Sequence, residues 1–416
     1  MSDTFPTLEI ILSADQLNRQ EPDTDNVSML VLIGATGLPN LPHLVPKVVY
    51  SIKQVQALGL TAAYDATTSL LYYHHVSEYF LENPNGELYL MTVDGMDLKQ
   101  VLGDSSNAGA IEPAIIDANG RIKQIAITSG DDSSSFFIDD IINDNLIEKA
   151  QGLADRLAAN HIKIDVIFLE GFGFNETAGD APDLRVKETP NVALVVGGDR
   201  AVANTNVSYN GYGAIGTALG CSTRKKVHES VAWTKEENNL ASPKDDRFLS
   251  VKISSDLSQA DKYLSDVTAL KALHNKGYIF PRRFPYLSGF YWNQSNNCMP
   301  ISSDFKNIES VQVINKAARI IGRTLAPHIN ETFDVTSEGR LTDIVKRTLA
   351  AEIRQALENN MGDNISAIGS IIVDPAKDAN NQPYPSILVD STLRAIVGIR
   401  PKGKTEIIWV LLGYQP

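Results

Sequence analysis

The chain has 416 residues, of which 43% are hydrophobic and 21% are charged, so it is long enough for two or three globular domains with a sizeable core. Its net charge of −13 argues against a general nucleic-acid-binding protein, because such a protein needs a basic surface to neutralise phosphates. Two cysteines are too few for a disulfide framework, and we expect no signal peptide, no membrane-inserted segment and assembly in the cytoplasm.

The first 26 residues predict an N-terminal arm rather than part of a core. Leu8, Ile10 and Leu12 lie in a short apolar run that is typical of a β-strand. A polar stretch follows, and Glu21-Pro22-Asp23 breaks any helix there. A terminal strand on a polar tether either frays or docks on something else, and we expect this one to be donated to a neighbouring subunit.

An α/β core is predicted over residues 27–300, because buried strand patterns alternate there with helix patterns. Strands that are separated by helices imply a mostly parallel sheet flanked by helices. The expected strands lie at 29–34, 88–93, 125–128, 166–169 and 192–196, and the expected helices at 51–58, 67–83 and 146–160. Loop-like stretches predict an outward-facing insertion at about 100–190, and the charged segment 235–247 is expected to be exposed.

Residues 301–416 are expected to form an α+β C-terminal domain. Apolar residues at helical spacing predict helices over 308–325 and 341–357, and strands are expected at 368–373 and 386–390 before a terminal hairpin over 391–416. Thr342 is a candidate cap for the second helix. The other face of that helix carries Lys346, Arg347 and Arg354.

The last predicted strand is unusual because it is apolar on both faces. Its side chains are Ile407, Ile408, Trp409, Val410, Leu411 and Leu412. A strand with one wet face would alternate apolar and polar residues, and an exposed apolar edge would aggregate. Two alternatives follow: the strand lies inside the chain's own sheet, or it is handed to another subunit as an added strand.

One motif points to nucleotide chemistry. Gly211-x-Gly213-x-x-Gly216 matches the dinucleotide-binding fingerprint in its letters, but no strand runs directly into the glycines as that fingerprint requires. The alternative is that small residues let a helix lie close to its neighbour. The chain has no phosphate-binding P-loop and no catalytic serine motif, and the pair His74-His75 lacks the spacing of a metal site. We therefore predict no catalytic, cofactor or metal site, and keep a nucleotide-binding α/β enzyme as the competing class.

Several stretches together resemble contractile tail sheath proteins, the sheath subunits of phage tails and of related injection particles. They are residues 74–93, 213–233, 276–298, 313–329 and the terminal hairpin. The resemblance implies a subtilisin-like core without protease chemistry, and extended terminal strands that link neighbouring subunits. It also implies a helical homo-oligomer of stacked six-fold rings around an inner tube protein, with baseplate and terminator proteins as further partners.

A mechanism follows from the resemblance as a hypothesis. The sheath assembles in a metastable extended state and contracts when its subunits move into a more favourable packing, without any cofactor. Either the helix 308–325 or the helix 341–357 is expected to touch the tube, with Lys346, Arg347 and Arg354 as candidate contacts. A capsid or baseplate protein of the same particle stays open as a third class, as does the choice between a phage and an injection device.

Overall fold

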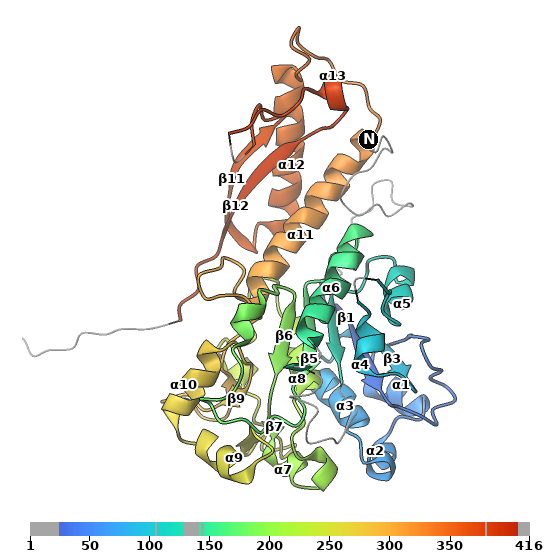
Figure 1. Cartoon of the computed structure of the whole chain (residues 1–416), viewed down its shortest axis with the longest axis vertical. Coiled ribbons are helices and arrows are strands. Elements are labelled where there is room, and N and C mark those ends of the chain that lie inside the picture. Colours follow the sequence, from blue (N-terminus) through green and yellow to red (C-terminus); the bar gives the residue numbers. More distant parts are fainter. Residues whose placement is uncertain (1–24, 105, 129–140, 143–144, 379–380, 407–416) are drawn as a thin grey trace, which may run out of the picture. The chain divides into compact units, whose positions relative to one another are not determined.

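The computed structural model describes residues 25–406, apart from residues 105, 129–140, 143–144 and 379–380 (Figure 1). The predicted strands at 8–12 and 407–412 therefore lie outside the described residues. Two compact units are present, one up to Gly322 and the other from Arg323. The boundary between them falls inside one continuous helix, α11 (Ile308–Leu325).

A six-stranded sheet with the order β2-β3-β1-β4-β5-β6 forms the centre of the first unit. Five strands run parallel and β2 pairs antiparallel at one edge. Every residue of β1, β4, β5 and β6 is buried, which explains why their sequences are continuous apolar runs. The strands are β1 (Val27–Ile33), β2 (Lys47–Val49), β3 (Glu87–Val93), β4 (Gln124–Ile127), β5 (Val166–Glu170) and β6 (Val192–Val195).

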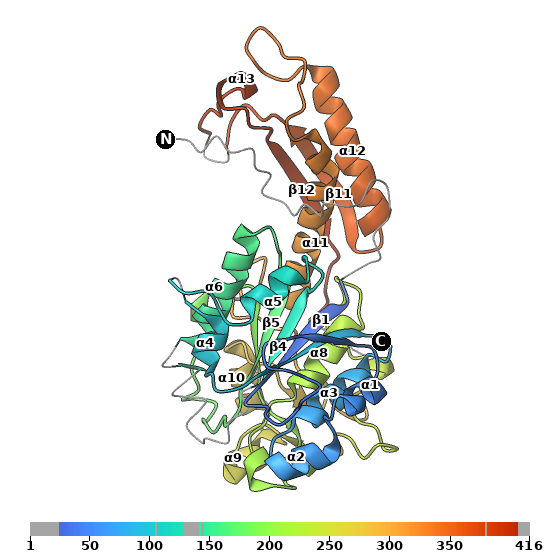
Figure 2. The same ribbon diagram turned by 90° about the vertical axis from the view of Figure 1, so that its right-hand side faces the viewer.

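Helices cover both faces of this sheet (Figure 2). One layer holds α1 (Ile52–Ala57), α2 (Ala62–Thr68), α3 (Tyr72–Glu82) and α8 (Ile215–Thr223). The other holds α4 (Leu98–Leu102), α5 (Glu112–Asp117) and α6 (Leu146–Ala159). Helix α8 packs directly on β1, β4 and β5, and α3 packs against α8. The predicted mostly parallel sheet flanked by helices is thus confirmed.

Short elements complete the first unit. They are β7 (Gly198–Asp199), α7 (Arg200–Ala203), β8 (Val251–Lys252), α9 (Leu257–Tyr263), α10 (Val267–Asn275), β9 (Pro281–Arg282), β10 (Tyr291–Trp292), η2 (Leu184–Lys187), η3 (Val207–Tyr209) and η4 (Glu236–Asn238). Strands β7 and β8 form one small antiparallel sheet, and β9 and β10 form another.

The second unit combines helices with a third antiparallel sheet. It contains η5 (Ala326–His328), α12 (Asp343–Met361), β11 (Ile365–Val373), α13 (Ile387–Asp390) and β12 (Ala395–Pro401). Strands β11 and β12 pair antiparallel, and α12 packs on them with Leu349, Ile353 and Leu357 buried. Thr342 is the residue before the first turn of α12, but its side chain makes no capping hydrogen bond.

Several expected elements differ from the structure. The single helix predicted over 67–83 is divided between α2 and α3, because Ser69 adopts a left-handed conformation with φ of 59°. The carboxylate of Asp65 accepts hydrogen bonds from Tyr73 N and His74 N at 2.9 Å each, so α2 caps the start of α3. The strand predicted at 386–390 is the short helix α13.

A further expectation needs correction. Residues 100–190 supply β4 and β5, which pair inside the central sheet, so most of this stretch belongs to the core rather than to an outward-facing insertion. The second strand of the terminal hairpin predicted over 391–416 lies outside the described residues. Strand β12, which precedes it, runs through Pro401 and pairs with β11.

Candidate functional site

The residues singled out as strand donors are Leu8, Ile10, Leu12, Ile407, Ile408, Trp409, Val410, Leu411 and Leu412, and all of them lie outside the described residues. The sheet that precedes the C-terminal segment is described. Within the described part of the chain it contains two strands, and no third strand pairs with either outer edge. Ile372 and Ile396 face each other across the two strands and are 47% and 43% exposed. As far as the structure describes the chain, this sheet therefore has unpaired edges and an apolar pair at its surface.

The three candidate tube contacts on α12 are not equivalent. Lys346 Nζ lies 3.6 Å from Asp374 Oδ2, and Arg354 Nη2 donates to the Gly369 carbonyl at 3.2 Å. Both cations therefore interact with the chain that α12 packs against. Arg347 is exposed, so it is the candidate whose charge is most available to another molecule.

The glycine motif lies at the start of α8, where it serves close packing. A Cβ atom on Gly216 would lie 2.1 Å from the His75 carbonyl oxygen of α3, and one on Gly213 would lie 2.4 Å from the Val195 carbonyl oxygen. Gly213 N donates to Glu170 Oε1 at 3.1 Å. A carboxylate thus occupies the position where a nucleotide phosphate would have to accept this hydrogen bond, and its negative charge would repel a phosphate.

A small pocket opens near the carboxyl ends of β4 and β5. His75, Thr128 and Glu170 line it together with aromatic side chains. His75 Nε2 lies 3.6 Å from Glu170 Oε1, which is beyond hydrogen-bond distance. Within the described residues no hydroxyl or thiol forms a hydrogen bond with His75, so the pocket holds no activated nucleophile of the serine–histidine kind.

Burial keeps three further side chains in their uncharged forms. Burial lowers the pKa of His74 to about 4, which keeps its ring neutral at pH 7. Burial raises the pKa of Cys298 to about 12 and that of Cys221 still higher, so both thiols stay protonated. Across the part of the chain that the structure describes, no group of three or more His, Cys, Asp or Glu side chains could hold a metal ion. None of its described helices is both long and apolar enough to span a lipid bilayer.

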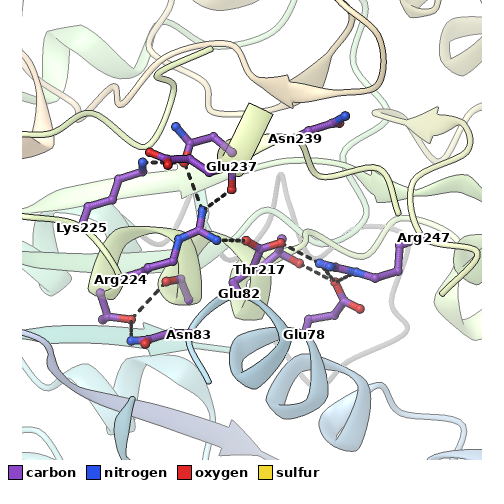
Figure 3. A network of polar contacts seen from close by, with 12 residues as sticks. Glu78, Glu82, Asn83, Thr217, Arg224, Lys225, Glu237, Asn239 and Arg247 are labelled. Atoms are coloured by element: carbon purple, nitrogen blue, oxygen red, sulfur yellow. Dashed lines mark hydrogen bonds and ion pairs between the residues drawn. The ribbon is translucent and has the colours of Figure 1, made fainter. Parts of the chain in front are cut away.

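A buried network of charges links α3 to the segment 235–247 (Figure 3). Arg247 Nη2 lies 2.6 Å from Glu78 Oε2 and 2.8 Å from Glu82 Oε1. Figure 3 also shows Arg224 of the chain after α8 reaching Glu82, at 3.3 Å between Nη1 and Oε2. The segment 235–247 was expected to be exposed, but Arg247 turns inward and only 11% of its side chain is accessible. We therefore interpret the network as a structural connection that holds α3 to the segment 235–247 and to the chain after α8.

A second buried ion cluster fixes the start of the described chain. Arg319 of α11 contacts Asp165 at 2.8 Å and Asp25 at 2.9 Å, and Lys316 also pairs with Asp25. Asp25 is the first described residue, and Asp165 precedes β5. These ion pairs fix Asp25 to α11 and to the start of β5.

Comparison with known proteins identifies a family and a fold. The model of the family described as DUF2586, N-terminal domain, matches residues 6–296, more than half of the chain. No curated protein matches the chain in sequence.

Three solved structures are similar over almost their whole length. A chain in the cryo-EM structure of the anti-feeding prophage baseplate is 13% identical with a TM-score of 0.57, and the match covers 99% of each chain. A chain in the PVC sheath complex of an extracellular contractile injection system, in the contracted state, is 11% identical with a TM-score of 0.54, covering 97% of this chain and 98% of that one. The sheath tail protein of Desulfitobacterium hafniense is 11% identical with a TM-score of 0.50, covering 94% and 100%. The predicted resemblance to contractile tail sheath proteins is therefore confirmed in the fold.

Proposed function

Since the chain belongs to the DUF2586 family and has the fold of contractile tail sheath proteins, we propose that it is a structural sheath subunit of a contractile tail or injection particle. The observation that carries the proposal is the match to a PVC sheath chain over 97% of this chain, which includes the second unit as well as the sheet core. An enzyme that shared only a common α/β core would match over the core alone.

The finer steps of the proposal concern assembly. Subunits form stacked six-fold rings around an inner tube, and baseplate and terminator proteins close the two ends. The core of the subunit is of the subtilisin-like type, and residues 1–26 form an arm. Assembly takes place in the cytoplasm of the producing cell. Contraction then drives the tube through a target envelope, powered by a difference in contact energy between two packings of the same subunits.

Strand donation links the subunits in this proposal. The open edges of the β11–β12 sheet support it, because an unpaired strand edge is a template for an added strand. The segment 407–412 follows β12 in sequence and is apolar on both faces, so it suits burial against a neighbour. The N-terminal run at 8–12 has the same character on a shorter scale.

Negative-stain electron microscopy of the purified chain tests this proposal. We expect hollow tubes from the full chain and dispersed, folded particles from a version that ends at Lys404. A matched control replaces Ile407 to Leu412 by six other apolar β-branched residues, which should still form tubes because strand addition depends on backbone hydrogen bonds and burial. Small uniform particles from every version would contradict the sheath proposal.

The tube contact is tested by charge reversal on α12. We expect Arg347→Glu to weaken co-assembly with the tube protein while the subunit keeps its stability, because Arg347 is exposed. Lys346→Glu is the informative control, since it places a carboxylate beside buried Asp374 and should also destabilise the second unit. Normal co-assembly of Arg347→Glu would remove this contact from the proposal.

The competing nucleotide-binding function receives no support from the glycine motif. The N–H group of Gly213 donates to Glu170, and Gly216 packs against α3. We therefore propose no cofactor and no catalytic role for the chain.

A further inference from the structure

The connection between β9 and β10 carries an aromatic side chain in an unfavourable backbone conformation. Leu287 N donates to the Phe284 carbonyl at 3.3 Å, which closes a β-turn with Pro285 and Tyr286 at its centre. Tyr286 has φ of 66°, the value that a type II turn requires at this position. Glycine or asparagine normally occupies such a position, because other side chains are strained there. The turn therefore presents a tyrosine at a conformational cost.

The same tyrosine does no packing within the subunit. Its exposed fraction is 105%, and the neighbouring Leu287 is 40% exposed. An aromatic residue that is both strained and fully exposed contributes nothing visible to folding stability. Tyr and Arg are the residues most often found at the energetic centres of protein interfaces, so this turn has the composition of a contact surface.

The base of the turn is held firmly. The Arg282 guanidinium lies 4.3 Å from the centre of the Phe284 ring, and that ring packs edge-on against Tyr291 at 6.2 Å. Phe290 N donates to Asn239 Oδ1 at 3.1 Å, which joins the end of the turn to the segment 235–247. A turn that is already ordered loses little entropy when it binds a partner.

Charge indicates what kind of partner fits. The stretch 267–303 contains Lys271, Lys276, Arg282 and Arg283 but no aspartate or glutamate, although the whole chain has a net charge of −13. A basic turn on an acidic molecule would repel a second copy of itself and attract the acidic remainder of another copy. A contact between two different patches of the same protein is heterologous, and contacts of this type propagate into rings and helical lattices.

We infer that residues 282–287 form a docking turn that binds an acidic surface on a neighbouring copy of this chain. Tyr286 is the apolar anchor, and Arg283, which is exposed at the side of the turn, steers the approach. The inference rests on the proposed function, because it assigns one of the contacts through which the subunits polymerise. It is separate from strand donation, since it uses side chains of the first unit rather than the terminal strands.

The experiment measures the concentration above which the purified chain assembles, by sedimentation, together with its thermal unfolding as a dispersed subunit. Tyr286→Gly is the decisive variant. Glycine accepts the φ of this position without strain, so the dispersed subunit should unfold at the same temperature or a higher one. The assembly concentration should nevertheless rise about tenfold. Arg283→Glu should raise it as well, and the effect should shrink at high salt because it is electrostatic.

Val207→Ser is the matched control, because Val207 is an exposed apolar residue of the same unit, at 86%, outside the turn. It should leave assembly unchanged. Tubes from the wild type together with unchanged assembly of Tyr286→Gly would overturn the docking turn and leave the sheath proposal intact. Normal self-assembly of Tyr286→Gly with loss only of co-assembly with the tube protein would also overturn it, since the partner would then be the tube. Failure of the wild type to form tubes at any concentration would overturn both proposals.

Discussion

Arg247 bridges two glutamates of α3, although 165 residues separate it from Glu82 in the sequence. All three side chains are nearly inaccessible to water, so each charge depends on the others for its solvation. Removing one partner of a buried ion pair leaves the other charge uncompensated, which costs far more than loss of an exposed pair.

We expect Arg247→Met to lower the free energy of unfolding by about 3 kcal/mol, the usual cost of breaking a buried ion pair. Chemical denaturation of the dispersed subunit measures it. Lys244→Met is the matched control, because Lys244 lies in the same segment but is exposed, and it should change stability by less than about 0.5 kcal/mol. Equal effects of the two substitutions would show that the buried network does not stabilise the fold.

His328 provides a pH-dependent contribution in the second unit. Partial burial lowers its pKa, but hydrogen bonds with Glu331 and Glu352 outweigh burial, and the pKa lies above its ordinary value. A raised pKa means that the folded state binds the proton more tightly than the unfolded state. The stabilisation is therefore fully present below about pH 6.5 and is lost as the pH rises through the higher pKa of the folded state.

Replacement of His328 by glutamine should accordingly lower the free energy of unfolding more at pH 5.5 than at pH 8.5. Because the site is partly exposed, we expect a difference of about 0.5 kcal/mol between pH 5.5 and pH 8.5. Thermal unfolding of wild type and variant at the two pH values measures it. A variant that is equally destabilised at both would show that the imidazolium form is not favoured by folding.

Helices α3 and α8 approach each other closely because glycines of α8 face the backbone of α3. A Cβ atom on Gly216 or Gly220 would meet a carbonyl oxygen of α3, at 2.1 Å from that of His75 or 2.7 Å from that of Tyr79. Backbone atoms cannot rotate out of the way as a flexible side chain can. The contact between these helices therefore depends on the absence of side chains rather than on their fit.

Alanine substitutions at two helical glycines should have opposite effects. Gly216→Ala should destabilise the subunit by about 2 kcal/mol, because α8 must move away from α3. Gly152→Ala in α6 should stabilise it by up to about 1 kcal/mol, since the nearest atom there is the end of the Arg156 side chain at 3.5 Å and alanine is the better helix former. Denaturant unfolding of both variants measures the difference. Equal stability of the two would contradict the packing role of Gly216.

Among the helices and strands, those that depend on a local sequence pattern were predicted from the sequence. Features that depend on contacts between separate segments were missed. The five parallel strands of the central sheet were predictable because each is mostly apolar, and α11 because its apolar residues recur every three or four positions. The short edge strand β2 was not predicted. The division between α2 and α3 was missed, since it depends on Asp65 of α2, whose carboxylate caps the start of α3. The strand predicted at 386–390 was wrong, because four apolar or small residues are too few to separate a strand from one helical turn. Glu78, Glu82 and Arg247 were missed as a group, since nothing local links them.

The described residues combine a mostly parallel sheet covered by helices with a sheet of two strands, β11 and β12, whose outer edges pair with no other described strand. In the first arrangement every residue of β1, β4, β5 and β6 is buried, and only the edge strand β2 has exposed residues. The second leaves backbone groups unpaired in the described residues, and natural monomers normally protect such edges. This difference between the two sheets is consistent with the proposal that a strand from a neighbouring subunit is added to the second sheet.

We predict that both thiols of the chain, those of Cys221 and Cys298, are unreactive in the native state. Both cysteines are buried and free, and burial raises the pKa of each. We expect the native subunit to react negligibly with a thiol reagent at pH 8 over an hour, and to react at both positions after unfolding in guanidinium. Absorbance of the released thiolate of an aromatic disulfide reagent gives the count. Rapid reaction of one native thiol would show that its segment opens locally.

If the two native thiols do not react, the wild-type chain can be labelled at an introduced cysteine without first replacing Cys221 and Cys298. A single cysteine placed at residue 286 would be the sole reactive position on a chain that otherwise needs no substitution. If the chain assembles as proposed, a fluorophore or a short bifunctional crosslinker attached there would identify the segment of a neighbouring copy that lies within reach of residue 286. The same label would show whether that neighbouring segment differs between two states of the assembly.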